Sequence, residues 1–383
     1  MLPVMSTEEE AHSHAVSRFI AERIAAAGGW LPFDEFMELA LYAPGLGYYS
    51  AGGVKIGRGG DFTTAPEVSD LFSQCVARQV SEVLGQTGGS GSVLELGAGT
   101  GRMAASVLTT LASLDALPEQ YAILEVSADL RDRQRARIEQ LPVELRQRVT
   151  WLDALPSKPL RGVILANEVL DALPCQRIVI RGGEAHELGV GFEAERFVER
   201  EAPEEALNRR AAREWHTVRS SLGFELEDGY RTELCARIEP WIAGLSDSLE
   251  QGLILLFDYG LPRAHYYHPQ RTDGTLRCHF KQRAHNDPLI NVGVQDITAW
   301  VDFTRVAEAA DSARLDVSGF ATQAAFLLGL GIEALIRDVR LASEARKLLM
   351  PGEMGEAFKA LALTRAVGAP LSGFSVQDLR HSL

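Results

Sequence analysis

Residues 93–101, Val-Leu-Glu-Leu-Gly-Ala-Gly-Thr-Gly, decide the fold class that this sequence predicts. Residues 93–96, apolar except for Glu95, have the length of a buried strand, and residues 102–114 have the apolar spacing of a helix. A turn with three glycines separates the two elements. Because a strand, a tight glycine turn and a helix in this order open a βαβ unit, we predict a parallel sheet around this segment.

The alternation of strand and helix continues after this segment. A charged helix is predicted over residues 128–140, and a late strand over residues 358–363. Further strands are predicted at residues 121–126, 149–152, 162–166 and 252–257. Strands that alternate with helices at this spacing form a doubly wound sheet. We therefore predict an α/β fold with a Rossmann-like sheet.

The N-terminal region is predicted to be mainly helical. A capping-box pattern, Thr7 and Glu10, opens one helix, and residues 33–42 and 69–84 have the periodicity of two more. Between these two, residues 52–60 contain five glycines. Such a segment is typical either of a surface linker or of a mobile lid over a site.

These patterns divide the chain into three parts. We predict an N-terminal helical region at residues 1–90, a Rossmann-like core at 91–365 and a tail at 366–383. Two segments interrupt the alternation of the core. We interpret both as insertions, a polar and helical one at about 195–250 and a second one at about 262–295.

The composition limits the kinds of molecule that we expect this protein to bind. A formal net charge of -14 argues against a nucleic-acid interface, which needs clustered positive charge. It is compatible with a small-molecule substrate, with a cationic peptide, or simply with ordinary solubility. The four cysteines are far apart and form no zinc pattern, so we expect no metal site. No apolar run is long enough to span a membrane, and the N-terminus lacks signal or transit features, so we expect a cytoplasmic protein.

The spacing of the glycines and the acidic residue before them limit the classes of ligand that this turn can bind. Gly97, Gly99 and Gly101 form G-x-G-x-G, which differs from the G-x-G-x-x-G that binds a dinucleotide pyrophosphate. Together with Glu95 they resemble the E/D-x-G-x-G-x-G motif of methyltransferases that use S-adenosylmethionine on this fold. The resemblance implies that the glycines bind the cofactor and that Glu95 helps to hold its ammonium group, directly or through water. A buried structural carboxylate is the alternative for Glu95.

Acidic residues after the next two strands complete the predicted cofactor site. Glu125 ends the strand after the glycine turn, where a carboxylate accepts hydrogen bonds from both ribose hydroxyls of a nucleoside. Asp153 follows the third strand and is predicted to receive the adenine amino group. A simple turn former is the alternative for Asp153.

Two carboxylates also follow the fourth strand, in the stretch 167–174, Asn-Glu-Val-Leu-Asp-Ala-Leu-Pro. Ligands on open α/β sheets bind beyond the carboxyl ends of the strands. Glu168 and Asp171 would therefore face the reactive group of the cofactor and hold a cationic nucleophile, such as a guanidinium, through charge-assisted hydrogen bonds. Helix capping by Asn167 or Asp171 is the alternative.

Several longer stretches resemble one family, the MidA-type methyltransferases. This family includes the mitochondrial complex I assembly factor that methylates a protein arginine. The matching stretches follow one another in the same order from about residue 30 to 365, at residues 48–49, 60–67, 167–174, 257–260, 293–298, 301–303, 319–331 and 354–359. One departure is the stretch 291–293, where a proline is expected before the glycine, and it affects only the geometry of that loop.

This resemblance implies a class I methyltransferase that uses S-adenosyl-L-methionine and releases S-adenosyl-L-homocysteine. It places residues 60–64 at the active site and adds Thr63 and Asn167 to the predicted cofactor-binding residues. The carboxylates of the predicted catalytic residues would orient a guanidinium and accept its proton. In order of preference, these residues are Glu168, Asp171, Asp61 and Glu67.

The predicted substrate is a protein arginine side chain, with a respiratory-complex subunit as one candidate protein. Two alternatives stay open: a small-molecule methyltransferase with the same cofactor site, and a cofactor-binding assembly chaperone without catalysis. The acidic N-terminus is typical of a bacterial member of the family rather than a mitochondrial one. The apolar stretch 325–332 is expected in the core, with a homodimer interface as the alternative.

Overall fold

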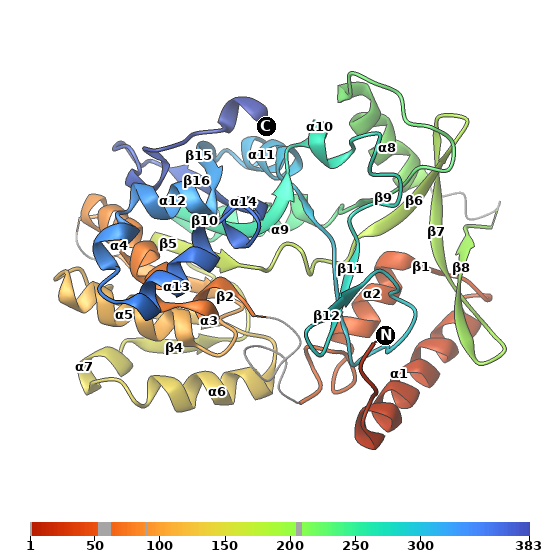
Figure 1. The fold of residues 1–383 in the computed structure, drawn as a ribbon, viewed down its shortest axis with the longest axis horizontal. Helices are drawn as coiled ribbons and strands as arrows, with labels where there is room; N and C mark the ends of the chain where they lie inside the picture. The colour runs from red at the N-terminus through yellow and green to blue at the C-terminus, as the bar shows by residue number, and fades with distance from the viewer. Residues whose placement is uncertain (1, 53–62, 89–90, 204–208) are drawn as a thin grey trace. The chain divides into compact units, whose positions relative to one another are not determined.

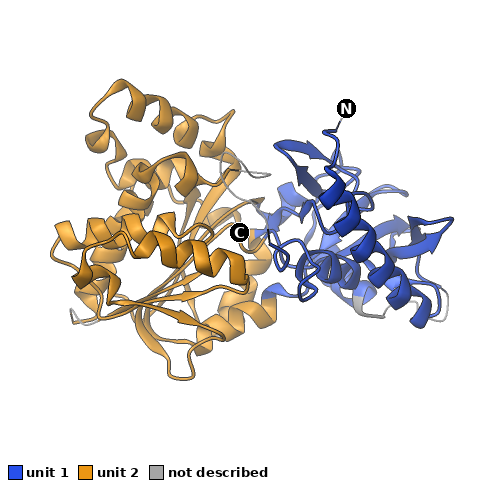
Figure 2. Ribbon diagram, turned by 90° about the horizontal axis from the view of Figure 1, so that it is seen from below, with its two compact units in different colours: residues 1–62, 171–238, 261–302 blue, residues 63–170, 239–260, 303–383 orange. Residues whose placement is uncertain are grey.

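The computed structural model describes residues 2–52, 63–88, 91–203 and 209–383, and the chain divides into two compact units (Figure 1). Unit 1 comprises residues 1–62, 171–238 and 261–302, and unit 2 comprises residues 63–170, 239–260 and 303–383 (Figure 2). Each unit is thus assembled from separated stretches of the chain, whereas the sequence patterns divide the chain into consecutive parts.

Unit 2 is built around the predicted parallel sheet, whose strands run in the order β15-β16-β10-β5-β2-β3-β4. Strands β4, β3, β2, β5 and β10 are parallel, whereas β16 pairs antiparallel with β10 and β15. Their bounds are β2 Ser92–Leu96, β3 Tyr121–Leu124, β4 Val149–Leu152, β5 Leu160–Asn167, β10 Leu249–Leu261, β15 Asp316–Thr322 and β16 Phe358–Arg365. The predicted α/β fold with a Rossmann-like sheet is confirmed, and the carboxyl ends of β5, β2 and β3 lie next to one another.

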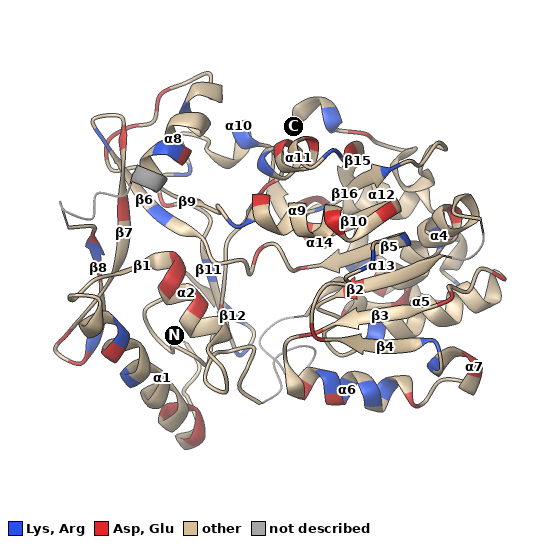
Figure 3. Cartoon of the chain, turned by 180° about the vertical axis from the view of Figure 1, so that it is seen from behind, with Lys and Arg blue, Asp and Glu red and all other residues tan. Residues whose placement is uncertain are grey.

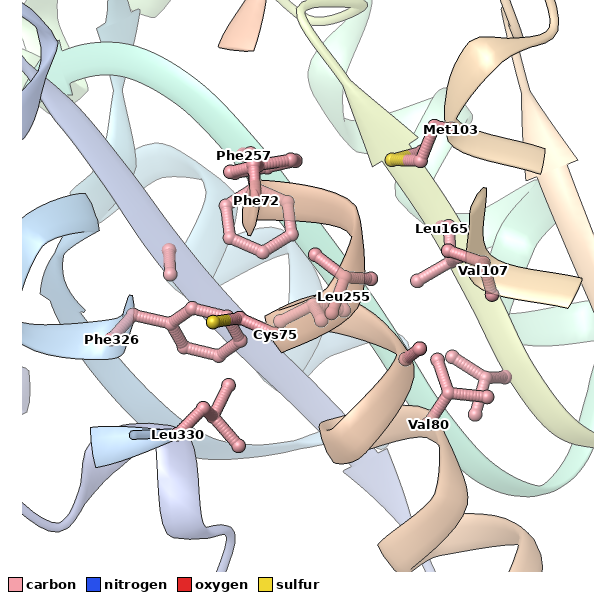
Figure 4. Packing of buried hydrophobic residues seen from close by; sticks show 14 of the residues in the cluster. Phe72, Cys75, Val80, Met103, Val107, Leu165, Leu255, Phe257, Phe326 and Leu330 are labelled. Atoms are coloured by element: carbon pink, nitrogen blue, oxygen red, sulfur yellow. The ribbon is translucent and has the colours of Figure 1, made fainter. Parts of the chain in front are cut away.

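Helices of unit 2 pack against this sheet through a continuous apolar core. The rings of Phe72, Phe257 and Phe326 contact one another edge to face, with centroid distances of 5.0 and 5.1 Å (Figure 4). They join α4 (Asp70–Gln86), β10 and α12 (Gln323–Gly329), and each buried ring contributes roughly 1.5–3 kcal/mol to folding. The predicted place of the stretch 325–332 in the core is confirmed by five of its side chains.

The helices that complete unit 2 follow the strands in the usual alternation. Their bounds are α3 Ala65–Val68, α4 Asp70–Gln86, α5 Arg102–Ser113, α6 Ala128–Ile138, α7 Val143–Arg146, α9 Ile238–Asp247, α11 Phe303–Ser312, α12 Gln323–Gly329, α13 Val339–Leu349 and α14 Met354–Ala357, with short 3-10 helices at Ile332–Leu335, Ser372–Phe374 and Arg380–Ser382. No helix among the described residues is both long and apolar enough to cross a membrane.

Unit 1 contains two antiparallel sheets, one with the order β1-β7-β6-β9 and with β8 on β7, the other with the order β12-β11-β13. The strands of these sheets are β1 Leu31–Pro32, β6 Gln176–Arg181, β7 Glu184–Glu193, β8 Arg196–Glu201, β9 Arg231–Leu234, β11 Arg277–Phe280, β12 Arg283–His285 and β13 Asp296–Thr298. The short strand β14, Val301–Asp302, belongs to neither of the two sheets. The helices are α1 Thr7–Ala26, α2 Phe33–Tyr42, α8 Arg209–Ser221 and α10 Arg263–Tyr266.

Two predictions for unit 1 were wrong in detail. The capping box of α1 is formed by Ser6 and Glu9, one residue earlier than predicted, and the Glu9 carboxylate accepts a hydrogen bond from the Ser6 N–H at 2.6 Å. The segment 195–250 is not purely helical, because β8 and β9 lie within it. Both strands are stabilised by pairing with strands elsewhere in the chain, a contribution that the local polar pattern does not reveal.

Candidate active site

The glycine turn, residues 97–101, follows β2 and leads directly into α5. Gly97, Gly99 and Gly101 have φ values of 61°, 53° and 77°, a left-handed backbone that other residues adopt only with strain. A Cβ on Gly101 would also lie only 3.1 Å from the Cα of Gln134. The turn therefore needs glycine both for its backbone angles and for the close approach of α6.

Glu95 lies on β2 just before this turn and is 1% exposed. The Tyr121 hydroxyl of the neighbouring strand β3 donates a hydrogen bond of 2.6 Å to its Oε2 atom. Burial raises the pKa of Glu95 to about 7, a rise that the bond from Tyr121 opposes and the nearby Glu125 carboxyl reinforces. Glu95 is thus a buried carboxyl group beneath the glycine turn, and its contact with a cofactor ammonium stays a prediction.

Glu125 lies directly after β3 and is also buried, with 4% of its surface exposed. Its Oε1 atom accepts a hydrogen bond from the Ser127 N–H at 2.9 Å, and its Oε2 atom accepts one from the Gln134 amide at 3.1 Å. Burial raises the pKa of Glu125, and both hydrogen bonds oppose the rise. The Val126 N–H adds a third hydrogen bond. Because a carboxylate has about four acceptor sites, it still has acceptor capacity for a ligand hydroxyl.

The residues around Glu125 connect β3 with β4. Arg131 donates to the Glu125 carbonyl and to the Leu152 carbonyl at 2.6 Å each, and its Nη1 atom lies 2.7 Å from Asp153. The Asp153 side chain is 92% exposed. Its ion pair with Arg131 supplies a structural role, and the predicted contact with an adenine amino group stays a prediction.

The β5 turn, residues 167–170, lies beside the glycine turn, and Cγ2 of Val169 would be 3.3 Å from a Cβ on Gly97. Glu168 has a φ of 55°, a strained value for a residue with a side chain. Its N–H donates to the Phe257 carbonyl at 2.8 Å, and its Oε1 atom accepts from the Asn167 side-chain amide at 3.1 Å. The turn therefore holds a half-buried carboxylate next to the predicted cofactor site.

Asp258, at the end of β10, supports the β5 turn from below. Its two oxygens accept the N–H groups of Leu170 and Tyr259 at 2.9 Å each. Asp258 is 1% exposed, so these charge-assisted bonds are protected from water. In contrast, the buried Oδ1 atom of Asn167 has no hydrogen-bond partner among the described residues.

Glu67 and Thr63 precede α4, close to the glycine turn. The Thr100 hydroxyl donates to the Glu67 carboxylate, and Arg102 donates to the Glu67 carbonyl at 2.7 Å and to Asp70 at 2.9 Å. These contacts anchor α3 to the turn, and a catalytic role for Glu67 stays a prediction. Thr63 is half-buried just before α3.

The other predicted catalytic residues do not lie in the described part of unit 2. Asp61 and the glycine-rich stretch after Gly52 lie outside the described residues. Asp171 belongs to unit 1, is 5% exposed, and accepts the Ala299 N–H on its carbonyl at 2.9 Å. The roles predicted for Asp61 and Asp171 stay predictions.

Sequence reasoning missed Gln134, Asp258 and Arg102. Gln134 and Asp258 are buried polar residues in segments that the sequence presents as a charged helix and an apolar strand. A polar residue at a position where the periodicity demands an apolar one is the signal that marks both of them.

Comparison with known proteins agrees with this geometry. The model of an S-adenosyl-L-methionine-dependent methyltransferase family matches residues 75–321. A crystal structure from Burkholderia thailandensis with S-adenosyl-homocysteine bound is 40% identical, with a TM-score of 0.93 and 100% of both chains covered.

Two curated relatives are similar over most of the chain. The protein arginine methyltransferase NDUFAF7 homolog, mitochondrial, of Drosophila melanogaster is 28% identical, with 97% of this chain and 91% of the relative covered. The protein arginine methyltransferase NDUFAF7, mitochondrial, of Danio rerio is 26% identical, with 94% and 90% covered. The resemblance to the MidA-type methyltransferases is confirmed. This chain therefore belongs to that family of S-adenosyl-L-methionine-dependent methyltransferases, and S-adenosyl-L-methionine is its cofactor.

Proposed function

We propose that this enzyme methylates an arginine side chain of a protein substrate. The observation that carries the proposal is Glu168, a carboxylate held in a strained backbone conformation beside the glycine turn. Strain of this kind persists where the surrounding structure enforces it, and it collects at functional sites. The names of the curated relatives, which are protein arginine methyltransferases, support the same substrate class.

The residues around the glycine turn fit S-adenosylmethionine. The three glycines of the turn carry no side chains that could obstruct a ligand, and Glu125 has acceptor capacity left for ribose hydroxyls. Val126, the next residue, is 75% exposed and offers an apolar surface to an adenine ring. The Oδ1 atom of Asn167, which has no hydrogen-bond partner in the described part of the chain, suits an N–H or O–H donor of the ligand. When bound, the cofactor supplies an electrophilic methyl group.

Glu168 provides what a guanidinium needs in this position. A carboxylate accepts two parallel N–H bonds from a guanidinium and so fixes its plane. The Asn167 amide occupies one acceptor site of Oε1 and thereby limits the rotation of the carboxylate. Methylation of a guanidinium nitrogen releases one proton, and a carboxylate in hydrogen-bond contact accepts it before passing it to water.

The experiment is methyl transfer from a labelled cofactor into total cellular protein, followed by acid hydrolysis and amino-acid analysis. We expect label in methylarginine. Glu168→Gln keeps the size of the side chain but removes its charge, so transfer should fall by roughly a hundredfold or more. The affinity for S-adenosyl-homocysteine should stay within about threefold, because Glu168 contributes to orienting the acceptor.

Glu144→Gln is the matched control, since Glu144 is exposed on α7 and far in sequence from the site. It should leave both transfer and binding unchanged. Label in another amino acid would overturn the arginine assignment, and label confined to small molecules would favour a metabolite substrate. Binding of S-adenosyl-homocysteine without any transfer would favour the non-catalytic assembly role.

A further inference from the structure

Gln134 is a fully buried amide on a helix that otherwise carries mostly charged side chains. Arginine and aspartate cover much of α6 (Figure 3). Its inner face consists of Leu130, Gln134 and Ile138, and Gln134 is 0% exposed. Burial of an amide is unfavourable unless its polar atoms find partners. The presence of glutamine between two apolar residues therefore raises the question of what it binds.

Three hydrogen bonds involve both the oxygen and the nitrogen of the Gln134 amide. Its Oε1 atom accepts from the indole N–H of Trp151 at 3.0 Å. Its Nε2 atom donates to the Gly99 carbonyl at 3.0 Å and to Oε2 of Glu125 at 3.1 Å. Because an indole N–H is only a donor, the oxygen of the amide must face Trp151, and both amide hydrogens are left for Gly99 and Glu125.

These contacts connect the ends of three neighbouring strands. Gly99 follows β2, Glu125 follows β3, and Trp151 lies on β4. The carbons of Gln134 also lie 3.1–3.4 Å from the place where a Cβ on Gly101 would be. By bonding to both, Gln134 fixes the distance between the glycine turn and the Glu125 carboxylate from the side of α6.

Three donors hold the Glu125 carboxylate. The Ser127 N–H donates to Oε1 and the Gln134 amide donates to Oε2, and the Val126 N–H adds a third hydrogen bond. Ser127 and Val126 are close in sequence to Glu125, whereas Gln134 is the donor that also contacts the turn. Without Gln134 the carboxylate would lose the bond that connects it to the glycine turn.

We propose that Gln134 is the positioning residue of the ribose subsite. Its amide sets the plane of the Glu125 carboxylate against the Gly99 carbonyl, so that the remaining acceptor sites of Glu125 meet the ribose hydroxyls of the cofactor. This inference rests on the ribose-binding role that the proposed function gives to Glu125. It assigns to α6 a part in cofactor recognition through a residue that does not itself contact the ribose.

The test is a binding comparison on the full chain with two ligands, S-adenosyl-homocysteine and its 2′-deoxy analogue, by calorimetry. The wild type should prefer S-adenosyl-homocysteine by roughly tenfold or more, as expected for a hydroxyl bonded to a carboxylate. Gln134→Met preserves length and helix propensity but removes all three hydrogen bonds. We expect this variant to weaken the binding of S-adenosyl-homocysteine by roughly tenfold and the binding of the analogue by less than about threefold. The preference for S-adenosyl-homocysteine would then be largely lost.

Gln140→Met is the matched control, because Gln140 is exposed just beyond the end of α6. It should leave both affinities unchanged. If Gln134→Met fails to fold by circular dichroism, Gln134→Glu decides. This variant keeps an acceptor for Trp151 and removes the donor to Gly99. Because two buried carboxyl groups in contact share one proton, the Glu125 carboxylate no longer presents the same acceptor to the ribose, and the preference should fall in the same way.

The outcomes separate the inference from the proposal beneath it. An equal loss for both ligands, or no loss for either, would overturn the positioning role of Gln134 while leaving the ribose assignment of Glu125 intact. A wild type that binds both ligands equally would overturn the ribose assignment itself, and the positioning role with it. Neither result depends on methyl transfer, so the arginine proposal is tested separately.

Discussion

The glycine turn and the β5 turn are neighbours on one sheet edge, and they reach a left-handed backbone in different ways. They follow β2 and β5, which pair in parallel with Leu96 opposite Ala166. In the glycine turn the left-handed positions are Gly97, Gly99 and Gly101, for which this conformation carries no side-chain strain. In the β5 turn the left-handed residue is Glu168, for which it costs of the order of 1 kcal/mol.

The polar groups of the two turns differ in the same sense. Near the glycine turn, Glu95 and Glu125 are buried, and each accepts at least one hydrogen bond from the protein. At the β5 turn, Asn167 has a buried oxygen without a partner among the described residues. The glycine turn adopts its left-handed backbone without side-chain strain. The β5 turn instead has a carboxylate residue at a position where glycine would be less strained. The difference supports the catalytic role that we propose for Glu168.

The largest expected effect comes from placing a side chain in the glycine turn. Gly101→Val combines a β-branched residue at a φ of 77° with a Cβ that would lie 3.1 Å from the Cα of Gln134. We expect the affinity for S-adenosyl-homocysteine, measured by calorimetry, to fall by more than roughly a hundredfold. Gly88→Val is the control, because Gly88 has a φ of 84° and no atom within 4 Å of its Cβ position. Wild-type affinity in Gly101→Val would show that the turn is not the cofactor site.

The parallel sheet was predictable from sequence because its signals are local. A buried strand, a glycine turn and the following helix lie within about twenty consecutive residues, and each has its own periodicity. The antiparallel sheets of unit 1 were not predicted. Strand β9 pairs with β6 across more than fifty residues, and the polar residues of β8 have no alternation strong enough to identify a strand. The pairing of β9 with β6 depends on tertiary contacts that no short window contains. In contrast, β6–β7, β7–β8 and β11–β12 are hairpins with two-residue turns, which are local features that the sequence analysis missed.

The same distinction applies to the site. Motif spacing identified Gly97, Gly99 and Gly101, whose left-handed conformations the structure contains. It did not identify Gln134, whose partners Gly99 and Trp151 lie 35 and 17 residues away. The residue type of Glu67 also did not reveal that its side chain accepts a hydrogen bond from Thr100. The sequence around a carboxylate does not show which residue will contact it, because that contact forms only in the folded protein.

The second prediction tests how strongly the buried carboxyl group beneath the glycine turn depends on pH. Burial raises the pKa of Glu95 from 4.5 to about 7, so the folded protein binds a proton more tightly than the unfolded chain does. The contribution of Glu95 to stability is therefore fully present below about pH 4.5 and is lost as the pH rises through about 7. Glu95→Gln cannot ionise and should not show this loss.

Denaturant unfolding at pH 5 and pH 8 measures this effect. Relative to the wild type, Glu95→Gln should gain of the order of 2 kcal/mol in the free energy of unfolding between the two pH values. Glu119→Gln, at an exposed position, is the control and should follow the wild type at both. A constant difference between Glu95→Gln and the wild type would show that the pKa of Glu95 in the folded protein is not raised above its value in the unfolded chain.

The smallest expected effect concerns the strain in the β5 turn, and it is the mirror image of the first prediction. Glu168→Gly and Glu168→Ala both remove the carboxylate, but only glycine adopts a φ of 55° without strain. We expect Glu168→Gly to be about 1 kcal/mol more stable than Glu168→Ala in denaturant unfolding, the reverse of the usual order of the two residues. Both variants should lose methyl transfer, since neither can bind a cation. If the alanine variant were equally stable, the backbone at Glu168 would store no strain, and the contrast between the two turns would reduce to their side chains alone.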